Sequence, residues 1–186
     1  FNKLTPLGES DLRNSISEYS KGVNFNIKNI FVIDGSKRST KANAFFSGLG
    51  NRKTIVLYDT LVKDHSQEEI VAVLAHEVGH YKKKHSLKMT LLSVLQTGVI
   101  LYLLSLFINV PVFSMALGAE GQSFYFGLIA FSILFSPIST VLGMGMNYLS
   151  RKHEFEADAY AKKTNSSMAL ISALKRLSVN QLSNLT

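Results

Sequence analysis

The sequence predicts a mainly helical α+β fold, in which a small sheet lies beside a helix carrying an H-E-x-x-H motif and a two-span transmembrane hairpin follows. Three observations predict this fold. The pentapeptide His76-Glu77-Val78-Gly79-His80 lies inside an apolar helical segment. Two stretches without a charged residue, 89–119 and 121–150, are each long enough to cross a bilayer. Short runs of β-branched and aromatic residues in the first third favour strands.

The first 65 residues are predicted to form a helix and a small sheet. Residues 10–19 favour a helix, and residues 30–33 and 54–58 favour strands. Residues 43–46, with the sequence Asn-Ala-Phe-Phe, form a short extended run. We expect this run either at an edge of the sheet, where a substrate strand can pair with it, or as a plain core strand.

Residues 66–88 are predicted to form the next helix. Ser66 and Glu69 have the spacing of a capping box, in which each side chain satisfies a free backbone N–H of the other residue. An apolar face follows, comprising Ile70, Val71, Val73, Leu74 and Val78. Gly79 lowers helix propensity inside the motif, but it leaves room for another segment or a substrate to approach closely.

The H-E-x-x-H motif predicts a zinc site with a catalytic base. His76 and His80 share one face of the helix, so they can hold one metal ion between them. Glu77 is turned about 100° from His76, where a base can take a proton from a metal-bound water. Zinc suits two imidazoles and an open position, and it lowers the pKa of bound water to about 7. We therefore predict one Zn²⁺ per chain and peptide hydrolysis, with two ordinary surface histidines as the alternative.

A third ligand is predicted in the segment that follows the second uncharged stretch. Glu154 and Asp158 share one helical face, whereas Glu156 is turned about 200° from Glu154. We assign Glu154 as the third zinc ligand and Asp158 as an acceptor that orients a ligand histidine. The alternative is a charged and solvated turn of helix, which we prefer for Glu156 and Lys152.

The sequence gives weaker indications for the positions of the remaining three histidines. His85 is about 140° around the helix from His80, and we expect either that it lines the site or that it lies at the membrane surface. His153 precedes the predicted ligand and is expected to be exposed or interfacial. His65 precedes the zinc-motif helix and is expected at the surface.

Residues 89–149 are predicted to form the transmembrane hairpin. The first span covers residues 89–110, and the second covers residues 124–149 with a kink at Pro137. Two buried helices of a soluble domain are the alternative. Residues 150–186 then form the third-ligand helix and a C-terminal helix, so that the chain makes one fragment of a catalytic domain.

The charge pattern predicts the orientation of the hairpin. Basic residues flank the outer ends of both spans, namely Lys82, Lys83, Lys84, Lys88, Arg151 and Lys152, whereas the connecting loop carries only Glu120. By the positive-inside tendency, the outer ends and the active site face the cytoplasm. The net charge of +7 is therefore attributed to membrane flanks, and no nucleic-acid partner is expected.

The ends and the cysteine content of the chain give two further expectations. The absence of cysteine excludes disulfides and is compatible with a reducing compartment. The chain has no initiator methionine, no signal peptide and no natural ending, so we expect a fragment of a longer membrane protein. Its oligomeric state has no signal in the sequence.

Several segments, in this order, resemble the type I CAAX prenyl proteases. They are Ser36-Lys37-Arg38, Asn43-Ala44-Phe45-Phe46, residues 55–61, residues 71–80 around the H-E-x-x-H motif, Leu149-Ser150-Arg151 and residues 154–161. The resemblance runs from about residue 31 to residue 177 and is much more specific than the motif alone.

The resemblance implies an integral membrane zincin of the gluzincin type, a zinc metalloendopeptidase. Carried over by position, His76, His80 and Glu154 bind zinc, and Glu77 is the general base. The extended run of Asn43, Ala44 and Phe45 is implied to bind the substrate. Arg151, like His85, is a candidate to line the site.

The family removes the C-terminal tripeptide from prenylated CAAX proteins, and some members also cut near the N-terminus of a prenylated precursor. The resemblance therefore implies a peptide or protein substrate, with or without a prenyl group, and a lipid bilayer around the spans. It implies the endoplasmic reticulum membrane in a eukaryote and the inner membrane in a bacterium.

Two features of the family are missing from this sequence, and three other functions stay open. Family members have more spans, around a large chamber, and a later His-Pro segment, which fits a truncated chain. One alternative is a bacterial-type membrane quality-control metalloprotease with non-prenylated clients. Another is a catalytically silent membrane scaffold with a structural zinc. A transporter or channel ranks last, because neither span contains an ionisable residue.

Overall fold

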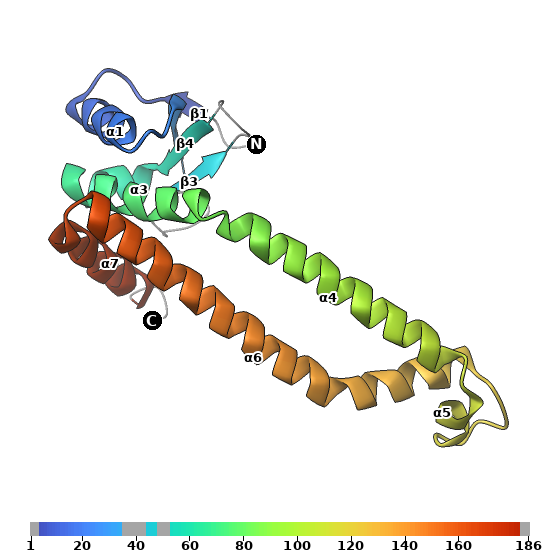
Figure 1. The fold of residues 1–186 in the computed structure, drawn as a ribbon. Coiled ribbons are helices and arrows are strands. Elements are labelled where there is room, and N and C mark those ends of the chain that lie inside the picture. The colour runs from blue at the N-terminus through green and yellow to red at the C-terminus, as the bar shows by residue number, and fades with distance from the viewer. Residues whose placement is uncertain (1–3, 35–43, 48–52, 183–186) are drawn as a thin grey trace. The chain divides into compact units, whose positions relative to one another are not determined.

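The computed structural model describes residues 4–34, 44–47 and 53–182 of the 186-residue chain. In chain order the elements are β1 (Leu4–Pro6), α1 (Asp11–Gly22), β2 (Ile27–Ile33), β3 (Ala44–Ser47), β4 (Lys53–Tyr58), α2 (Asp59–Asp64), α3 (Gln67–Lys82), α4 (His85–Ile108), α5 (Pro111–Met115), α6 (Phe124–Thr164) and α7 (Ser167–Leu182) (Figure 1). The predicted fold class, mainly helical with a small sheet, is confirmed.

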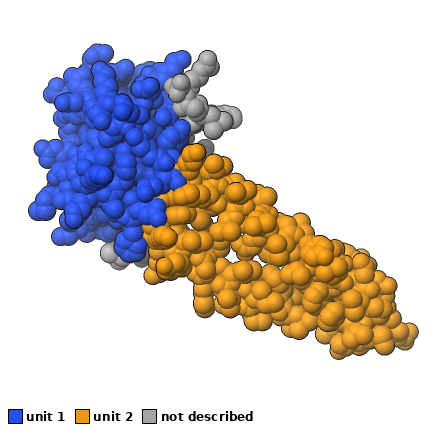
Figure 2. Space-filling view, viewed as in Figure 1, with its two compact units in different colours: residues 1–83, 154–186 blue, residues 84–153 orange. Residues whose placement is uncertain are grey.

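The chain divides into two compact units (Figure 2). Residues 1–83 and 154–186 form the first unit, which contains the sheet, α3 and α7. Residues 84–153 form the hairpin unit, which contains α4, α5 and most of α6.

A four-stranded mixed sheet in the order β1-β2-β4-β3 lies in the first unit. The central strands β2 and β4 are parallel, while β1 and β3 pair antiparallel with them. β3 is the last strand of this order, and Phe45 lies opposite Val56 of β4. The predicted extended run thus forms an outer strand of the described sheet, although Asn43 itself lies outside the described residues.

α3 is the central helix of the first unit. Its N-terminus has the predicted capping box, because Ser66 Oγ accepts a hydrogen bond from the Glu69 N–H and the Glu69 carboxylate accepts one from the Ser66 N–H. Most of the helix is buried, since the sheet and α1 pack on one side and α6 and α7 on another. A helix covered from several sides has apolar residues around most of its circumference.

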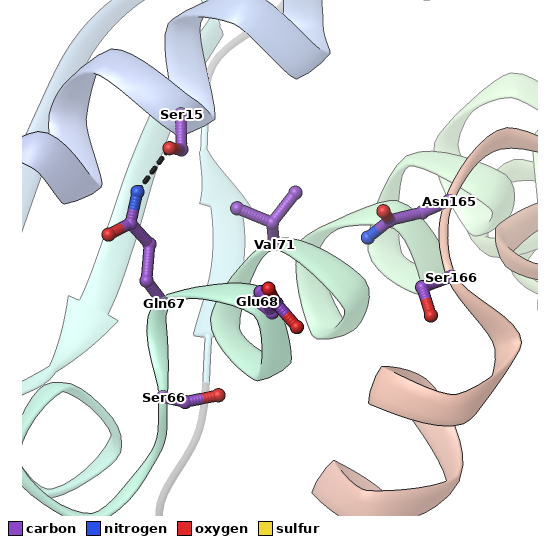
Figure 3. A pocket seen from close by; sticks show the side chains of 7 residues that line it. All are labelled: Ser15, Ser66, Gln67, Glu68, Val71, Asn165 and Ser166. Atoms are coloured by element: carbon purple, nitrogen blue, oxygen red, sulfur yellow. Dashed lines mark hydrogen bonds between the residues drawn. The ribbon is translucent and has the colours of Figure 1, made fainter.

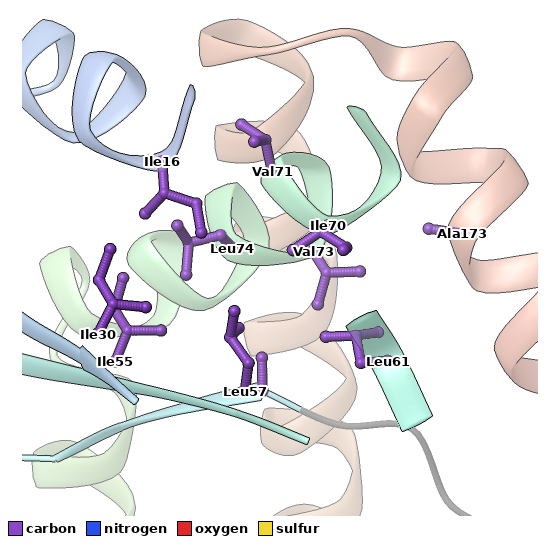
Figure 4. Packing of buried hydrophobic residues seen from close by; sticks show 11 residues of the cluster. Ile16, Ile30, Ile55, Leu57, Leu61, Ile70, Val71, Val73, Leu74 and Ala173 are labelled. Atoms are coloured by element: carbon purple, nitrogen blue, oxygen red, sulfur yellow. The ribbon is translucent and has the colours of Figure 1, made fainter. Parts of the chain in front are cut away.

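The main core of the first unit joins the sheet to α3 (Figure 4). Ile55 and Leu57 of β4 are fully buried in a larger cluster that includes Ile70 and Leu74 of α3 and Ile16 of α1. Full burial of each such side chain contributes about 1.5–3 kcal/mol to stability. A second cluster forms where α3 packs against α6 and α7. Small side chains let these helices approach closely there, namely Ala72, Ala75, Ala161 and Ala169.

Among the residues that the structure describes, two helices are long and apolar enough to cross a membrane, namely α4 and α6. Their most apolar windows have a mean hydropathy of 2.2 in α4 and 1.9 in α6, and only 0% and 17% of these windows are buried. Phe107 near the end of α4 contacts Phe131 near the start of α6, so the helices run antiparallel. Pro137 lies inside α6, and Figure 1 shows this helix bending in its first half, as expected where a backbone N–H is missing.

Two boundaries differ from the sequence prediction. The zinc-motif helix is predicted to reach residue 88, but α3 ends at Lys82 and α4 begins at His85. Lys84 between them has a left-handed backbone with φ of 56°, which interrupts a right-handed helix. The boundary predicted at residue 150 falls inside α6, which continues to Thr164 because residues 150–156 contain no glycine or proline to break it.

Candidate metal centre

The two motif histidines lie together on one face of α3. Nε2 of His76 and Nε2 of His80 are 3.0 Å apart. The rings meet edge to face with centroids 4.7 Å apart. Both side chains keep some exposure, 15% for His76 and 22% for His80, so that a solvent molecule or a substrate can reach them.

Glu154 of α6 completes a triangle with these two nitrogens. Its Oε2 lies 3.4 Å from His76 Nε2 and 3.6 Å from His80 Nε2. One ligand atom from each of the three residues lies within 4.8 Å of the other two. The structure therefore brings together the three residues predicted as ligands, two from α3 and one from α6.

The spacing of these atoms fits a zinc ion. Zinc binds nitrogen and oxygen at about 2.0–2.1 Å, so two ligand atoms at a tetrahedral angle are separated by roughly 3.3–3.4 Å. The observed separations of 3.0, 3.4 and 3.6 Å lie on both sides of this value. Two imidazoles and a carboxylate are also a ligand set of catalytic zinc sites, which keep a fourth position open. Both the chemistry and the geometry of the donors thus suit zinc.

Asp158 lies one helical turn after Glu154 and contacts the other nitrogen of a histidine. Its Oδ1 is 2.8 Å from Nδ1 of His76. An ionised carboxylate only accepts hydrogen bonds, so Nδ1 carries the hydrogen and donates it to Asp158. The lone pair of His76 is then on Nε2, the nitrogen that lies beside His80 and Glu154.

Glu77 is partly buried beside the ligand residues. Burial raises the pKa of its carboxyl, the electrostatic interaction with His76 lowers it, and the interaction with Glu154 raises it, with a net rise above the ordinary value. A carboxylate with a raised pKa is a better proton acceptor near neutral pH. Glu77 therefore has the electrostatic surroundings that a general base requires.

Gly79 sets the distance between α3 and α6 at the ligands. A Cβ at this position would lie 3.1 Å from the Cα and the carbonyl oxygen of Ala157, and 3.2 Å from Cβ of Tyr160. Two of these neighbours are backbone atoms, which cannot move aside as a flexible side chain can. The sequence predicts a close approach at Gly79, but it does not identify α6 as the partner.

The other candidate residues have different surroundings. His85 and Arg151 belong to the hairpin unit, and their site-lining role stays a prediction. His85 is buried, with 2% exposure, and its ring stacks on that of His153. His65 is predicted at the surface, but this is wrong, because it is only 7% exposed. It directly follows α2 as its C-cap, with Nδ1 lying 3.4 Å from Glu69 Oε2.

A polar pocket of about 820 Å³ lies near the other end of α3 (Figure 3). Its lining comes from α1, the start of α3 and the turn between α6 and α7, namely Ser15, Ser66, Gln67, Glu68, Val71, Asn165 and Ser166. Gln67 donates a hydrogen bond to Ser15 Oγ across it. His76 and His80 follow Gln67 by about 2.5 and 3.6 turns of α3, and neither lines the pocket, so this pocket is separate from the metal centre.

Comparison with known families gives a match over almost the whole chain. The sequence model of peptidase family M48 matches residues 6–183. Among curated relatives, CAAX prenyl protease 1 of Saccharomyces cerevisiae is 40% identical over 201 residues, covering 100% of this chain and 44% of the relative. The human CAAX prenyl protease 1 homolog is 33% identical over 221 residues, covering 98% of this chain and 46% of the relative.

A solved structure is similar as well. The crystal structure of S. mikatae Ste24p matches with a TM-score of 0.84 and 39% sequence identity, covering 98% of this chain and 46% of that one. The chain thus spans less than half the length of these relatives.

Proposed function

The chain belongs to peptidase family M48, and we propose from this premise that it forms the catalytic part of a zinc-dependent membrane endopeptidase. Membership of the family implies a metal cofactor. The observation that carries the proposal is the triangle of His76 Nε2, His80 Nε2 and Glu154 Oε2, whose sides of 3.0, 3.4 and 3.6 Å suit one zinc ion per chain.

The proposed reaction is the hydrolysis of a peptide bond. When bound, zinc supplies Lewis-acid chemistry, which polarises the scissile carbonyl and lowers the pKa of water to about 7. Glu77 accepts a proton from the attacking water, whose oxygen bonds to the carbonyl carbon. Glu77 then delivers this proton to the nitrogen that leaves when the C–N bond breaks.

Two side chains prepare the ligands for this reaction. Asp158 accepts the hydrogen of His76 Nδ1, which fixes the ring and leaves Nε2 free to bind the metal. Glu154 is 57% exposed, so one side of the centre stays open for a peptide. The net rise in the pKa of Glu77 supports its role as proton acceptor and donor.

We propose that the substrate peptide pairs with β3 as an additional strand. β3 is the last strand in the order of the described sheet, and Phe45 is 38% exposed. Pairing through the backbone accepts many side chains, which suits a protease with more than one substrate. Ala44 and Phe45 are the described residues of this strand that we assign to substrate binding, and the assignment of Asn43 rests on the family resemblance.

The proposed substrates are prenylated proteins with a C-terminal CAAX sequence. The support is the similarity to CAAX prenyl protease 1 of S. cerevisiae, at 40% identity, and to its human homolog, at 33% identity. We propose that a prenylated protein loses its C-terminal tripeptide at the metal centre. Membrane quality control with non-prenylated clients is the second candidate, and it uses the same chemistry.

We propose that the active site faces the cytoplasm and that the membrane is that of the endoplasmic reticulum. The eukaryotic relatives support the compartment. The basic residues at the outer ends of the spans, opposed by Glu120 in the loop, support the side. Single cysteines at residues 84 and 120 of the otherwise cysteine-free chain test it, since a membrane-impermeant reagent should label one of them and not the other from a given side.

The experiment that tests the function compares two peptides. Purified full-length protein is given a farnesylated CAAX peptide and the same peptide without the farnesyl group, with and without a zinc chelator. We expect cleavage of the farnesylated peptide before its last three residues, and its loss on chelation. Equal cleavage of both peptides would favour the quality-control protease, and no zinc-dependent cleavage of either would favour the silent scaffold.

A further inference from the structure

A pair of stacked histidines joins the two apolar helices at one end of the hairpin unit. His85 begins α4, and His153 lies on α6. Their ring centroids are 4.1 Å apart, and the ring planes differ by 11°. The residues next to each histidine are therefore close together, although they are far apart in the sequence.

Those neighbouring residues form a basic cluster of four exposed side chains: Lys84, Lys88, Arg151 and Lys152. None of the four has an ion pair within the part of the chain that the structure describes. Glu120 is the acidic residue of the hairpin unit, and it lies in the loop between α5 and α6, at the other end of α4. The positive charge of this unit is thus concentrated at one end and uncompensated within the unit.

The length of α4 and the residues near the basic cluster both place this end of the hairpin unit at a membrane surface. Tyr148 lies one turn before Lys152 on α6 and is 70% exposed, and tyrosine is enriched where a helix leaves the hydrocarbon. From Lys88 to Ile108, α4 rises roughly 30 Å, which equals the thickness of the hydrocarbon core. The basic cluster is then at the depth of lipid phosphates, while the exposed apolar side chains of both helices lie among acyl chains.

We propose that the basic cluster binds the headgroups of anionic phospholipids. The guanidinium of Arg151 can hold one phosphate through two parallel N–H donors, and the three lysines supply compact charges on flexible stems. Lipid is the occupant because apolar helices hold this end at the bilayer surface, where anionic headgroups are concentrated. The inference goes beyond the proposed catalytic function and does not require Glu77 or the metal.

The test counts lipids bound to the full-length protein. The protein is reconstituted into nanodiscs of phosphatidylcholine with a minor fraction of phosphatidylserine, extracted in mild detergent, and its retained lipids are measured by mass spectrometry. We expect the parent to retain phosphatidylserine at least roughly threefold above its share of the nanodisc lipid. The variant with glutamine at all four positions of the basic cluster should lose this enrichment. Added salt should weaken the enrichment in the parent, because ions screen exposed charges.

Two control variants distinguish the effect of the basic cluster from the effects of a lower net charge and of misfolding. Glutamine at four exposed lysines of the first unit, Lys21, Lys28, Lys162 and Lys175, removes the same charge and should keep the enrichment. Arginine at Lys84, Lys88 and Lys152 keeps the charge and should keep the enrichment as well. The proposal is overturned if the parent retains the bulk lipid composition, or if the four-glutamine variant of the basic cluster still enriches phosphatidylserine. Displacement of the lipid by low concentrations of inorganic phosphate would also overturn it, since that would indicate a general anion site.

Discussion

Asp158 Oδ1 lies 2.8 Å from His76 Nδ1, although the two residues are 82 positions apart in the sequence. The contact joins α6 to α3 at the metal centre, and it acts on the nitrogen that does not face the other ligands. Because the carboxylate accepts the Nδ1 hydrogen, it selects the tautomer in which His76 Nε2 can bind zinc. Asp158 is therefore expected to matter for metal affinity without being a ligand.

Replacement of Asp158 by alanine should lower zinc affinity by about 10- to 100-fold, the range observed when a ligand histidine loses its hydrogen-bond acceptor. Competition with a chelator of known affinity measures this change. The matched control is Glu156→Ala on the same helix, turned about 200° from Glu154, which should leave the affinity nearly unchanged. An unaltered zinc affinity in Asp158→Ala would contradict the proposed role of Asp158 in orienting His76.

Gly79→Ala should weaken both the fold and the metal centre. The new Cβ would approach backbone atoms of Ala157 to 3.1 Å, so α6 must shift away from α3. Overpacking of this kind costs about 1–3 kcal/mol. Where zinc binding must restore the close approach, the zinc affinity should fall by roughly 5- to 150-fold. Gly22→Ala at the end of α1 is the control, because nothing lies within 4 Å of its added Cβ. Equal zinc affinities and melting temperatures in the two variants would contradict this explanation.

The stability of the first unit should fall in acid through Glu69. Burial raises the pKa of this carboxyl, but hydrogen bonds from Ser172 and Ser66 lower it, and the charges of Arg176 and His65 add to them, so that its pKa is below the ordinary value. A folded-state pKa below the unfolded one stabilises the fold above the unfolded pKa. This stabilisation is lost as the pH falls through the lowered folded-state pKa.

Ser172→Ala tests this pH dependence. Ser172 Oγ donates a hydrogen bond to Glu69 Oε1 at 2.5 Å, so its loss should cost about 1–3 kcal/mol at neutral pH. The variant should also lose less additional stability on acidification, because its folded-state pKa is closer to the unfolded one. Thermal unfolding from neutral pH to below the ordinary carboxyl range measures both effects. Ser178→Ala on the same helix, which bonds only Leu174 O among the described residues, is the control and should behave as the parent.

Proline in β3 tests the proposed pairing with a substrate strand. Ala44→Pro and Phe45→Pro each remove one backbone N–H. Alternate N–H groups of a strand point to opposite edges, so one of the two variants should lose affinity for a peptide inhibitor while keeping its zinc. Isothermal titration with the inhibitor measures the affinity. If both variants bind it as tightly as the parent, the substrate is held elsewhere.

The local chemistry of the site could be predicted from the sequence because helical spacing determines it. The four-residue separations of His76 from His80 and of Glu154 from Asp158 place each pair on one face of its helix. The capping box of Ser66 and Glu69 is also a local pattern, and it forms as predicted. The two long apolar helices follow from length and composition alone.

Features that depend on short elements or distant contacts could not be predicted. β1, α2 and α5 contain 3, 6 and 5 residues, too few for a periodic signal. His65 directly follows α2, so its burial could not be predicted either. The end of α3 at Lys82 depends on the left-handed backbone of Lys84, a residue type that rarely adopts it. The contact of Gly79 with α6 requires the tertiary fold.

The zinc content of two purified variants of the full-length protein tests the central claim most directly. His80→Ala removes a proposed ligand, whereas Glu77→Gln removes the proposed base and leaves all three ligands in place. Elemental analysis should find about one zinc per chain in the parent and in Glu77→Gln, and little in His80→Ala. Glu77→Gln should nevertheless lose peptide turnover by about 10²- to 10⁴-fold, because an amide cannot transfer the proton. One equivalent of zinc retained by His80→Ala, or near-normal turnover by Glu77→Gln, would contradict the account.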